Sequence, residues 1–145
     1  MLRKKILVIE GPNTNLLGDR ESSIYGKESF ESVNRQIEEK AQSVGLGCEV
    51  YHSNVEGNII SKIQKAREQF DGIIINAGSY SYYSYAIRDA LAAAKIPAVE
   101  VHPSNIYAQE EFRRKSVLAD ICLGQICGFG KQGYFLALDA LNHIL

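Results

Sequence analysis

ILVIEGPNTNLLGDRESSIYG, residues 6–26, is the stretch from which both the fold and the first candidate site can be inferred. Its four aliphatic residues, 6–9, predict a buried parallel strand that ends at the Gly-Pro-Asn turn. A long polar loop follows, and such loops in compact domains are usually functional or disordered. Arg20 precedes Tyr25 by five residues, and a neighbouring cation can lower the pKa of a phenol. The loop is therefore a candidate active-site segment, the alternative being a surface loop whose tyrosine simply packs.

Strand and helix patterns alternate along the rest of the chain. Apolar residues at spacings of three and four predict a helix that begins after Ser29 as N-cap and ends at Gly45. Further strands are expected at residues 48–53, 72–76, 98–101 and around 122–127. Further helices are expected at residues 59–70, 86–94 and 133–142, together with a short basic helix in EEFRRKS at 110–116. Pro97 is expected to stop the helix before it.

This alternation predicts an α/β fold. Strands that alternate with helices imply right-handed crossovers and a parallel sheet with helices on both faces. Five such units in 145 residues favour a flavodoxin-like, five-stranded parallel sheet of order 2-1-3-4-5. With 46% hydrophobic residues and no linker or repeat, the chain is expected to be a single domain, residues 1–145.

Composition argues against several classes of partner. A formal net charge of -1 gives no reason to expect binding to nucleic acid or to an anionic membrane. The basic start MLRKK precedes only four apolar residues, so it predicts a strand and not a signal peptide. No stretch approaches the roughly 18 apolar residues of a membrane helix. We expect a soluble, cytoplasmic protein whose three cysteines are buried, reduced thiols.

The predicted sheet places polar side chains together. Ligands of open parallel sheets bind outside the carboxyl ends of the strands, where the strand order reverses. The polar residues that follow strands one, three and four are Asn13, Asn76, and His102 with Ser104. We expect these side chains to converge on one crevice, with Arg20 and Tyr25 close enough to fold over it.

The sequence lacks several common catalytic devices. It has no GxGxxG after the first strand, no GxxxxGK[ST] and no GxSxG, so dinucleotide, triphosphate and Ser-nucleophile sites are not expected. Its three histidines do not have the spacing of a metal site, so no metal is expected. The remaining tyrosine, arginine, histidine and amides suit proton transfer next to a carbonyl group.

These residues lie in segments that resemble type II 3-dehydroquinate dehydratase over nearly the whole chain. The matching segments are GPNTNLLGDRESSIYG at 11–26, SNVEG at 53–57, IINAG at 74–78, YAIRDAL at 85–91, EVHPSNIYAQEEFRRKS at 100–116 and GQICGFGKQGYFLAL at 124–138. The resemblance implies a flavodoxin-like lyase of the shikimate pathway, and hence of aromatic amino acid biosynthesis, assembled as a homo-oligomeric dodecamer of trimers. It also implies anti elimination of water from 3-dehydroquinate through an enolate, without a cofactor or metal.

Residue roles follow from the resemblance where the motif positions match. Tyr25 would be the general base, and Arg20 would stabilise its phenolate and help to close the site. Asn13 would stabilise the enolate oxygen. His102 would protonate the departing hydroxyl, with Glu100 setting its orientation and charge.

The resemblance also implies a group of substrate-holding residues. Asn76, Ser104 and Arg113 would hold the substrate hydroxyls and carboxylate. Asp89 would act near the subunit interface and reach a neighbouring site.

Five positions depart from the family pattern. Tyr82 replaces a histidine that helps to bind the substrate hydroxyls. Pro103 stands where a backbone N–H usually meets the substrate carboxylate, and proline has no such donor. The other departures are Gln109 for arginine, Ser22 for proline and Glu10 for asparagine.

Two alternative functions follow from these observations. Tyr82, Pro103 and Gln109 favour a related lyase with a shifted substrate preference. A non-catalytic, flavodoxin-like binding module is the alternative that rests on fold alone.

Overall fold

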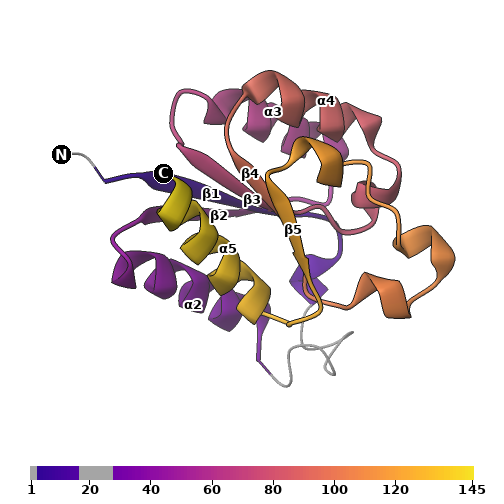
Figure 1. Cartoon of the computed structure of the whole chain (residues 1–145), viewed down its shortest axis with the longest axis horizontal. Helices are drawn as coiled ribbons and strands as arrows, with labels where there is room; N and C mark the ends of the chain where they lie inside the picture. Colours follow the sequence, from indigo (N-terminus) through magenta and orange to yellow (C-terminus); the bar gives the residue numbers. More distant parts are fainter. Residues whose placement is uncertain (1–2, 17–27) are drawn as a thin grey trace.

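The described residues, 3–16 and 28–145 of the computed structural model, contain one five-stranded parallel sheet of order β2-β1-β3-β4-β5 (Figure 1). The strands are β1 (Lys5–Glu10), β2 (Gly47–His52), β3 (Gly72–Asn76), β4 (Ala98–His102) and β5 (Gly124–Cys127). All four strand pairs are parallel, which confirms the predicted order. The strand order reverses at β1, because β2 lies on one side of β1 and β3 lies on the other. A ligand site is expected at this position.

Helices cover both faces of this sheet. The helices are α2 (Phe30–Ser43), α3 (Glu56–Ala66), α4 (Tyr85–Ala94) and α5 (Gln132–Ile144). Figure 1 shows α2 and α5 together on one face, and α3 and α4 together on the other. No helix in the described part of the chain is long and apolar enough to cross a membrane.

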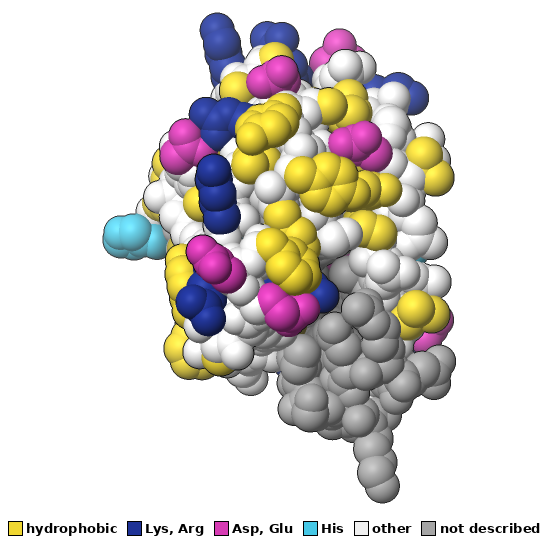
Figure 2. Space-filling view, turned by 90° about the vertical axis from the view of Figure 1, so that its right-hand side faces the viewer, with side chains coloured by type: hydrophobic (Ala, Val, Ile, Leu, Met, Phe, Trp, Pro, Cys, Tyr) yellow, Lys and Arg dark blue, Asp and Glu magenta, His cyan; other side chains and the backbone are white. Residues whose placement is uncertain are grey.

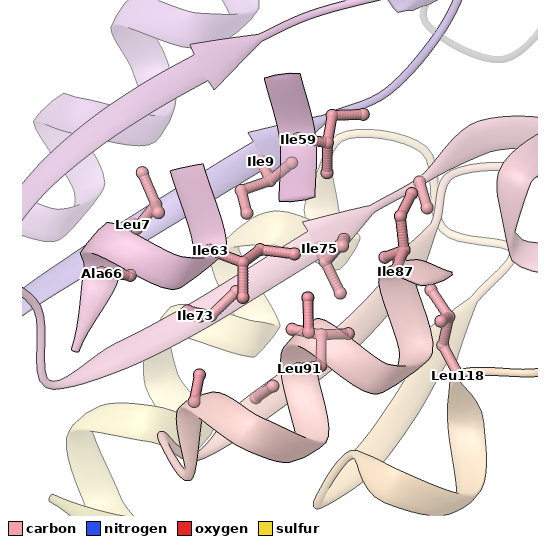
Figure 3. Packing of buried hydrophobic residues seen from close by; sticks show 14 of the residues in the cluster. Leu7, Ile9, Ile59, Ile63, Ala66, Ile73, Ile75, Ile87, Leu91 and Leu118 are labelled. Carbon is pink, nitrogen blue, oxygen red and sulfur yellow. The ribbon is translucent and has the colours of Figure 1, made fainter. Parts of the chain in front are cut away.

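The alternation along β1 explains the two cores. Leu7 and Ile9 are fully buried against α3 and α4, where Figure 3 shows them beside Ile63. Ile6 and Val8 point the other way, against α2 and α5. Successive strand side chains point to opposite faces, so a continuous aliphatic run has both faces buried. Each such buried side chain contributes roughly 1.5–3 kcal/mol of hydrophobic free energy.

The structure agrees with the sequence expectation at the end of α4 and differs from it in the basic segment 110–116. α4 ends at Ala94 because Lys95 adopts a left-handed conformation with φ 55°, two residues before Pro97. The segment 110–116 forms only a 3-10 turn, Glu111–Arg113, in place of the expected basic helix. Its single large apolar side chain, Phe112, gives it no apolar stripe to bury, and short helices depend on such burial.

The N-cap and end of α2 are as predicted. The Ser29 hydroxyl accepts a hydrogen bond from the Ser32 backbone N–H at 3.1 Å. The helix ends before Gly45, which has φ 82°. A side-chain cap and a terminal glycine satisfy backbone groups that the helix itself leaves unpaired.

The cysteines are free thiols, as expected, but none is fully buried. Burial is nevertheless sufficient to raise the pKa of Cys48 and that of Cys122 to about 12. Both thiols are therefore un-ionised at neutral pH, which disfavours reaction as nucleophiles.

Candidate active site

A pocket opens at the carboxyl end of the sheet, between the loops that follow β1, β3 and β4. Its lining residues are Glu10, Pro12, Asn13, Thr14, Leu16, Phe30, Val33, Asn34, Asn76, Gly78, Ser79, Tyr82, His102, Pro103, Ser104, Ile106, Gln109, Arg113 and Tyr134. The structure thus brings together the four polar residues expected to converge there from three separate loops. Arg20 and Tyr25 lie outside the described residues.

The loops after β1 and β3 are held against each other by a close backbone approach. The Gly11 N–H donates a hydrogen bond of 2.7 Å to the Asn76 carbonyl oxygen. A Cβ atom at Gly11 would lie 2.5 Å from the carbonyl oxygen of Ala77, closer than packed atoms come. Only glycine therefore allows this approach.

Asn13 is fixed by its backbone. It has φ 70°, and its N–H donates to the Asn54 side-chain oxygen at 2.9 Å. Asparagine tolerates this left-handed conformation better than most residues. The contact leaves the Asn13 side chain at the pocket wall.

The amide of Asn76 has a defined orientation. Its nitrogen donates to the Tyr134 hydroxyl at 2.8 Å, and its oxygen accepts from the Gly78 N–H at 3.2 Å. Asn76 is buried at the end of β3, and Tyr134 comes from α5. Sequence reasoning did not identify Tyr134, because its position fits the apolar face of a helix.

His102 and Glu100 form a buried pair on β4. The His102 Nε2 atom lies 2.8 Å from the Glu100 Oε2 atom, and Glu100 is 0% exposed. Residues two apart on a strand point to the same face, so the spacing itself predicts this contact. Since Nε2 faces the carboxylate, Glu100 sets the orientation of the imidazole ring.

Two further side chains hold Glu100, and sequence reasoning identified neither. The Ser116 hydroxyl lies 2.9 and 2.7 Å from the two carboxylate oxygens. The Gln125 amide nitrogen donates to Oε1 at 3.1 Å, from the position directly beside Glu100 on β5. Predicting Gln125 would have required the β4–β5 register, and a buried carboxylate needs such partners.

Arg113 is bound to Tyr82, one of the departures from the family pattern. Its Nη1 donates to the Tyr82 hydroxyl at 2.9 Å, and its Nε donates to Glu110 at 3.1 Å. The guanidinium carbon also lies 5.7 Å from the centroid of the Tyr82 ring, within cation–π range. Tyr82 therefore positions the guanidinium beside the pocket.

The remaining predicted site residues divide into two groups. Pro103, Ser104 and Gln109 line the pocket. Asp89 is exposed on α4 and does not line it within the described part of the chain. Residues 3–16 and 28–145 contain no cluster of three or more His, Cys, Asp or Glu side chains that could hold a metal ion.

Glu10 is a pocket residue to which the sequence assigned no role. It is 3% exposed at the end of β1, and burial raises the pKa of its carboxyl from 4.5 to about 8. A carboxyl with this pKa is mostly protonated at neutral pH.

Comparison with known proteins agrees with this geometry. The family model of class II dehydroquinases matches residues 4–142. A 3-dehydroquinate dehydratase of Caldicellulosiruptor bescii is 57% identical over 143 residues, which cover 98% of this chain and 99% of that protein.

Two crystal structures have the same fold. The type II dehydroquinase of Butyrivibrio crossotus has a TM-score of 0.94 and 52% identity, covering 97% of this chain and 98% of its own. The enzyme of Propionibacterium acnes has a TM-score of 0.93 and 39% identity, covering 98% of each chain. By the matched family model, the identity and the shared fold, this chain belongs to the class II dehydroquinase family.

Proposed function

We propose that this chain is a 3-dehydroquinate dehydratase, a hydro-lyase of the shikimate pathway that forms 3-dehydroshikimate without a cofactor or metal. Family membership and the names of its relatives support the activity. The observation that carries the proposal is the buried His102–Glu100 pair in the wall of a pocket that Asn13 and Asn76 also line.

Proton abstraction is the first step of the proposed mechanism. Tyr25, as phenolate, takes the proton from the carbon next to the ketone, and Arg20 stabilises the phenolate by its positive charge. The electron pair of the broken C–H bond moves into an enolate. Asn13, in the loop after β1, stabilises the developing negative charge on the enolate oxygen.

Loss of water is the second step, by anti elimination. His102 gives a proton to the departing hydroxyl group as the enolate collapses to the conjugated enone. Its Nε2 faces Glu100, so the other ring nitrogen, Nδ1, is the proton donor. The Glu100 carboxylate stabilises the imidazolium form that carries this proton.

Substrate orientation is assigned to polar groups around the same pocket. Asn76, Ser104 and Arg113 hold the substrate hydroxyls and carboxylate, and Tyr82 takes the place of a histidine. Pro103 gives the carboxylate no backbone N–H, which weakens its binding by about 1.5–3 kcal/mol. Gln109 lines the pocket as an uncharged side chain in place of an arginine.

Assembly belongs to the same proposal. Figure 2 shows apolar side chains along the middle of one face, with basic and acidic side chains around them. Exposed apolar surface of this kind marks a protein interface. We assign the chain to a dodecamer of trimers in which Asp89, exposed on α4, reaches the site of a neighbouring subunit.

The decisive experiment follows the enone chromophore after purified protein is mixed with 3-dehydroquinate. His102→Asn and Tyr25→Phe are each expected to lower kcat by about 10²–10⁴-fold, because each removes a proton-transfer group. His143→Asn, at an exposed histidine, and Tyr107→Phe, at an exposed tyrosine, are the matched controls with wild-type kcat.

Absence of the chromophore at high protein concentration would overturn the proposal. A protein in which Tyr25→Phe and Arg20→Ala leave function untouched would instead be a non-catalytic binding module.

The Tyr82–Arg113 bond favours a second candidate, a related lyase acting on another cyclic hydroxy ketone or acid. The Arg113 N–H that donates to the Tyr82 hydroxyl is not available to the substrate. If this reading is right, Tyr82→His raises kcat/KM for 3-dehydroquinate by about tenfold or more, the gain expected from one charge-assisted hydrogen bond. An unchanged kcat/KM removes the reason for the second candidate.

A further inference from the structure

Glu10 belongs both to the sheet and to the wall of the pocket. It is the last residue of β1, between His52 on β2 and Asn76 on β3 in the strand registers. It lines the pocket while being 3% exposed. Its Oε1 atom has no hydrogen-bond partner among the described residues. A buried carboxyl oxygen without a partner is costly, so this atom needs an explanation.

The groups that face Glu10 supply no positive charge that would stabilise an adjacent carboxylate. β2 carries His52 and Cys48 on the same face, and α5 brings the phenol of Tyr134 to the pocket. Burial lowers the pKa of His52 and raises that of Cys48 to about 12, so both are mostly uncharged at neutral pH. The pocket-lining residues of α2 are the non-ionisable Phe30, Val33 and Asn34.

Other ionisable groups belong to different walls of the pocket. His102 is paired with Glu100, and Arg113 is bound to Tyr82 and Glu110. Burial raises the pKa of the Glu10 carboxyl to about 8. At neutral pH its carboxyl is therefore mostly un-ionised and has an O–H group to donate.

Asn34 supplies a complementary group. Its Oδ1 atom is buried without a hydrogen-bond partner among the described residues, and the residue lines the same pocket. An amide oxygen only accepts, whereas an un-ionised carboxyl can donate. A ligand hydroxyl can do both, accepting from Glu10 and donating to Asn34.

We propose that Glu10 and Asn34 form a hydroxyl-binding subsite, in which un-ionised Glu10 donates a hydrogen bond to a ring hydroxyl of an anionic substrate. The identity of that substrate as 3-dehydroquinate rests on the proposed function. Both residues position the substrate and take no part in the proton transfers. Ionisation of Glu10 removes the donor and sets a negative charge near an anion, so binding requires the Glu10 proton.

The test compares KM and kcat for 3-dehydroquinate at pH 6.5 and pH 9.5. In the wild type, KM is expected to rise by about tenfold or more over this range, as Glu10 loses its proton. Glu10→Gln keeps a neutral donor that cannot ionise. Its KM is therefore expected to rise less than the KM of the wild type over the same pH range.

The rise in KM that belongs to Glu10 is the difference between the pH profiles of the variants. Other titrating groups, such as those that transfer protons, are shared by all of them. Glu39→Gln, an exposed carboxyl on α2, follows the wild-type pH profile. Glu10→Gln loses the part of the KM rise that belongs to Glu10, while its kcat at pH 6.5 stays within about twofold of wild type because no reacting atom is touched.

Asn34→Leu tests the acceptor separately. It removes the amide oxygen at similar volume and is expected to raise KM about five- to tenfold at pH 6.5, the effect of one lost hydrogen bond, with kcat retained. This variant also decides the matter if Glu10→Gln does not fold.

An active enzyme in which Glu10→Gln keeps the full wild-type rise in KM overturns the subsite and leaves the proposed function standing. Absence of turnover in the wild type overturns the proposed function instead. The subsite is then decided by the rise in Tm that 3-dehydroquinate produces at the two pH values. A smaller rise at pH 9.5 in the wild type, but not in Glu10→Gln, supports it, and equal behaviour of the two proteins overturns it.

Discussion

Glu100 shows how a single buried side chain organises the site. Its carboxylate contacts His102, Ser116 and Gln125 while being fully buried. The Ser116 hydroxyl also accepts hydrogen bonds from the backbone N–H groups of Leu118 and Ala119, at 3.0 and 3.1 Å. One hydroxyl thus links the carboxylate to the loop that leads to β5.

We predict that Ser116→Ala destabilises the protein by about 1–3 kcal/mol, since it removes one hydrogen-bond partner of a buried carboxylate and the side-chain acceptor of two backbone N–H groups. Urea unfolding measures this loss. The kcat for 3-dehydroquinate is expected to fall with KM nearly unchanged, because the Glu100–His102 pair loses its support. Ser61→Ala, at an exposed position of α3, is the control and changes stability by less than about 0.5 kcal/mol. Equal stability of the two variants would contradict the role of Ser116.

Glu10 makes folding stability depend on pH. Its folded pKa, about 8, lies above the ordinary value of 4.5, so the folded protein retains a proton that the unfolded chain has lost. The stability that this proton contributes is fully present below pH 4.5 and is lost as pH rises through 8. We predict that the unfolding free energy of Glu10→Gln, relative to wild type, increases by up to a few kcal/mol between pH 5 and pH 9.

Denaturant unfolding at pH 5, 7 and 9 measures this difference. Glu39→Gln, at an exposed carboxyl, should show no comparable trend. A constant difference between Glu10→Gln and wild type across the three pH values would mean that Glu10 is ionised in the folded protein.

At the scale of elements, the site depends on loops that the strands bring together. β1 and β3 are neighbours, and the turn after β1 lies against the turn after β3 through Gly11 and Ala77. Gly78, with φ 59°, lies in the second turn. A Cβ atom at this position would lie 3.1 Å from the Pro12 carbonyl oxygen. The first turn has no room for a side chain at Gly11, and the positive φ of Gly78 disfavours a side chain in the second turn.

We predict that Gly11→Ala destabilises the protein by more than about 2 kcal/mol, because a backbone must move to make room for the methyl group. The shift would also displace Asn13 and Asn76, so kcat/KM is expected to fall. Thermal unfolding and the enone assay measure the two effects. Gly57→Ala is the matched control: no atom lies within 4 Å of its Cβ, and it belongs to α3. Removal of a helical glycine stabilises by up to about 1 kcal/mol. The same loss of stability in both variants would contradict this account.

At the scale of the whole molecule, apolar surface remains exposed after the two cores have formed. Tyr85 is 63% exposed at the start of α4, and Asp89 follows it by one helical turn, so the two residues share a face of that helix. Tyrosine is enriched in protein interfaces relative to the rest of the protein surface. This face therefore fits the proposed contact through which Asp89 reaches a neighbouring subunit.

We predict that light scattering gives the mass of a dodecamer, and that Tyr85→Glu lowers this mass by placing a charge in a packed contact. Ser61→Glu, on the exposed side of α3, is the control that leaves the mass unchanged. A monomer at all protein concentrations would contradict the proposed assembly, and an unchanged mass for Tyr85→Glu would exclude this face from the contact.

The sequence by itself determined the sheet, its strand order and the edge where the site lies. The short aliphatic runs at 6–9 and 73–75 indicate strands buried on both faces, and their alternation with amphipathic helices leaves few topologies. It also placed Asn13, Asn76 and His102 at one edge, because parallel strands end together. Patterns of burial are local, so a sequence displays them directly.

Only the tertiary structure decided which partners these side chains have. Tyr134 is 58 residues from the Asn76 amide that it contacts, and Gln125 meets Glu100 through a strand register that no local pattern specifies. The protonation of Glu10 depends in the same way on the elements packed over it. Hydrogen bonds and desolvation act over a few ångströms in space, and those distances exist only once the chain has folded.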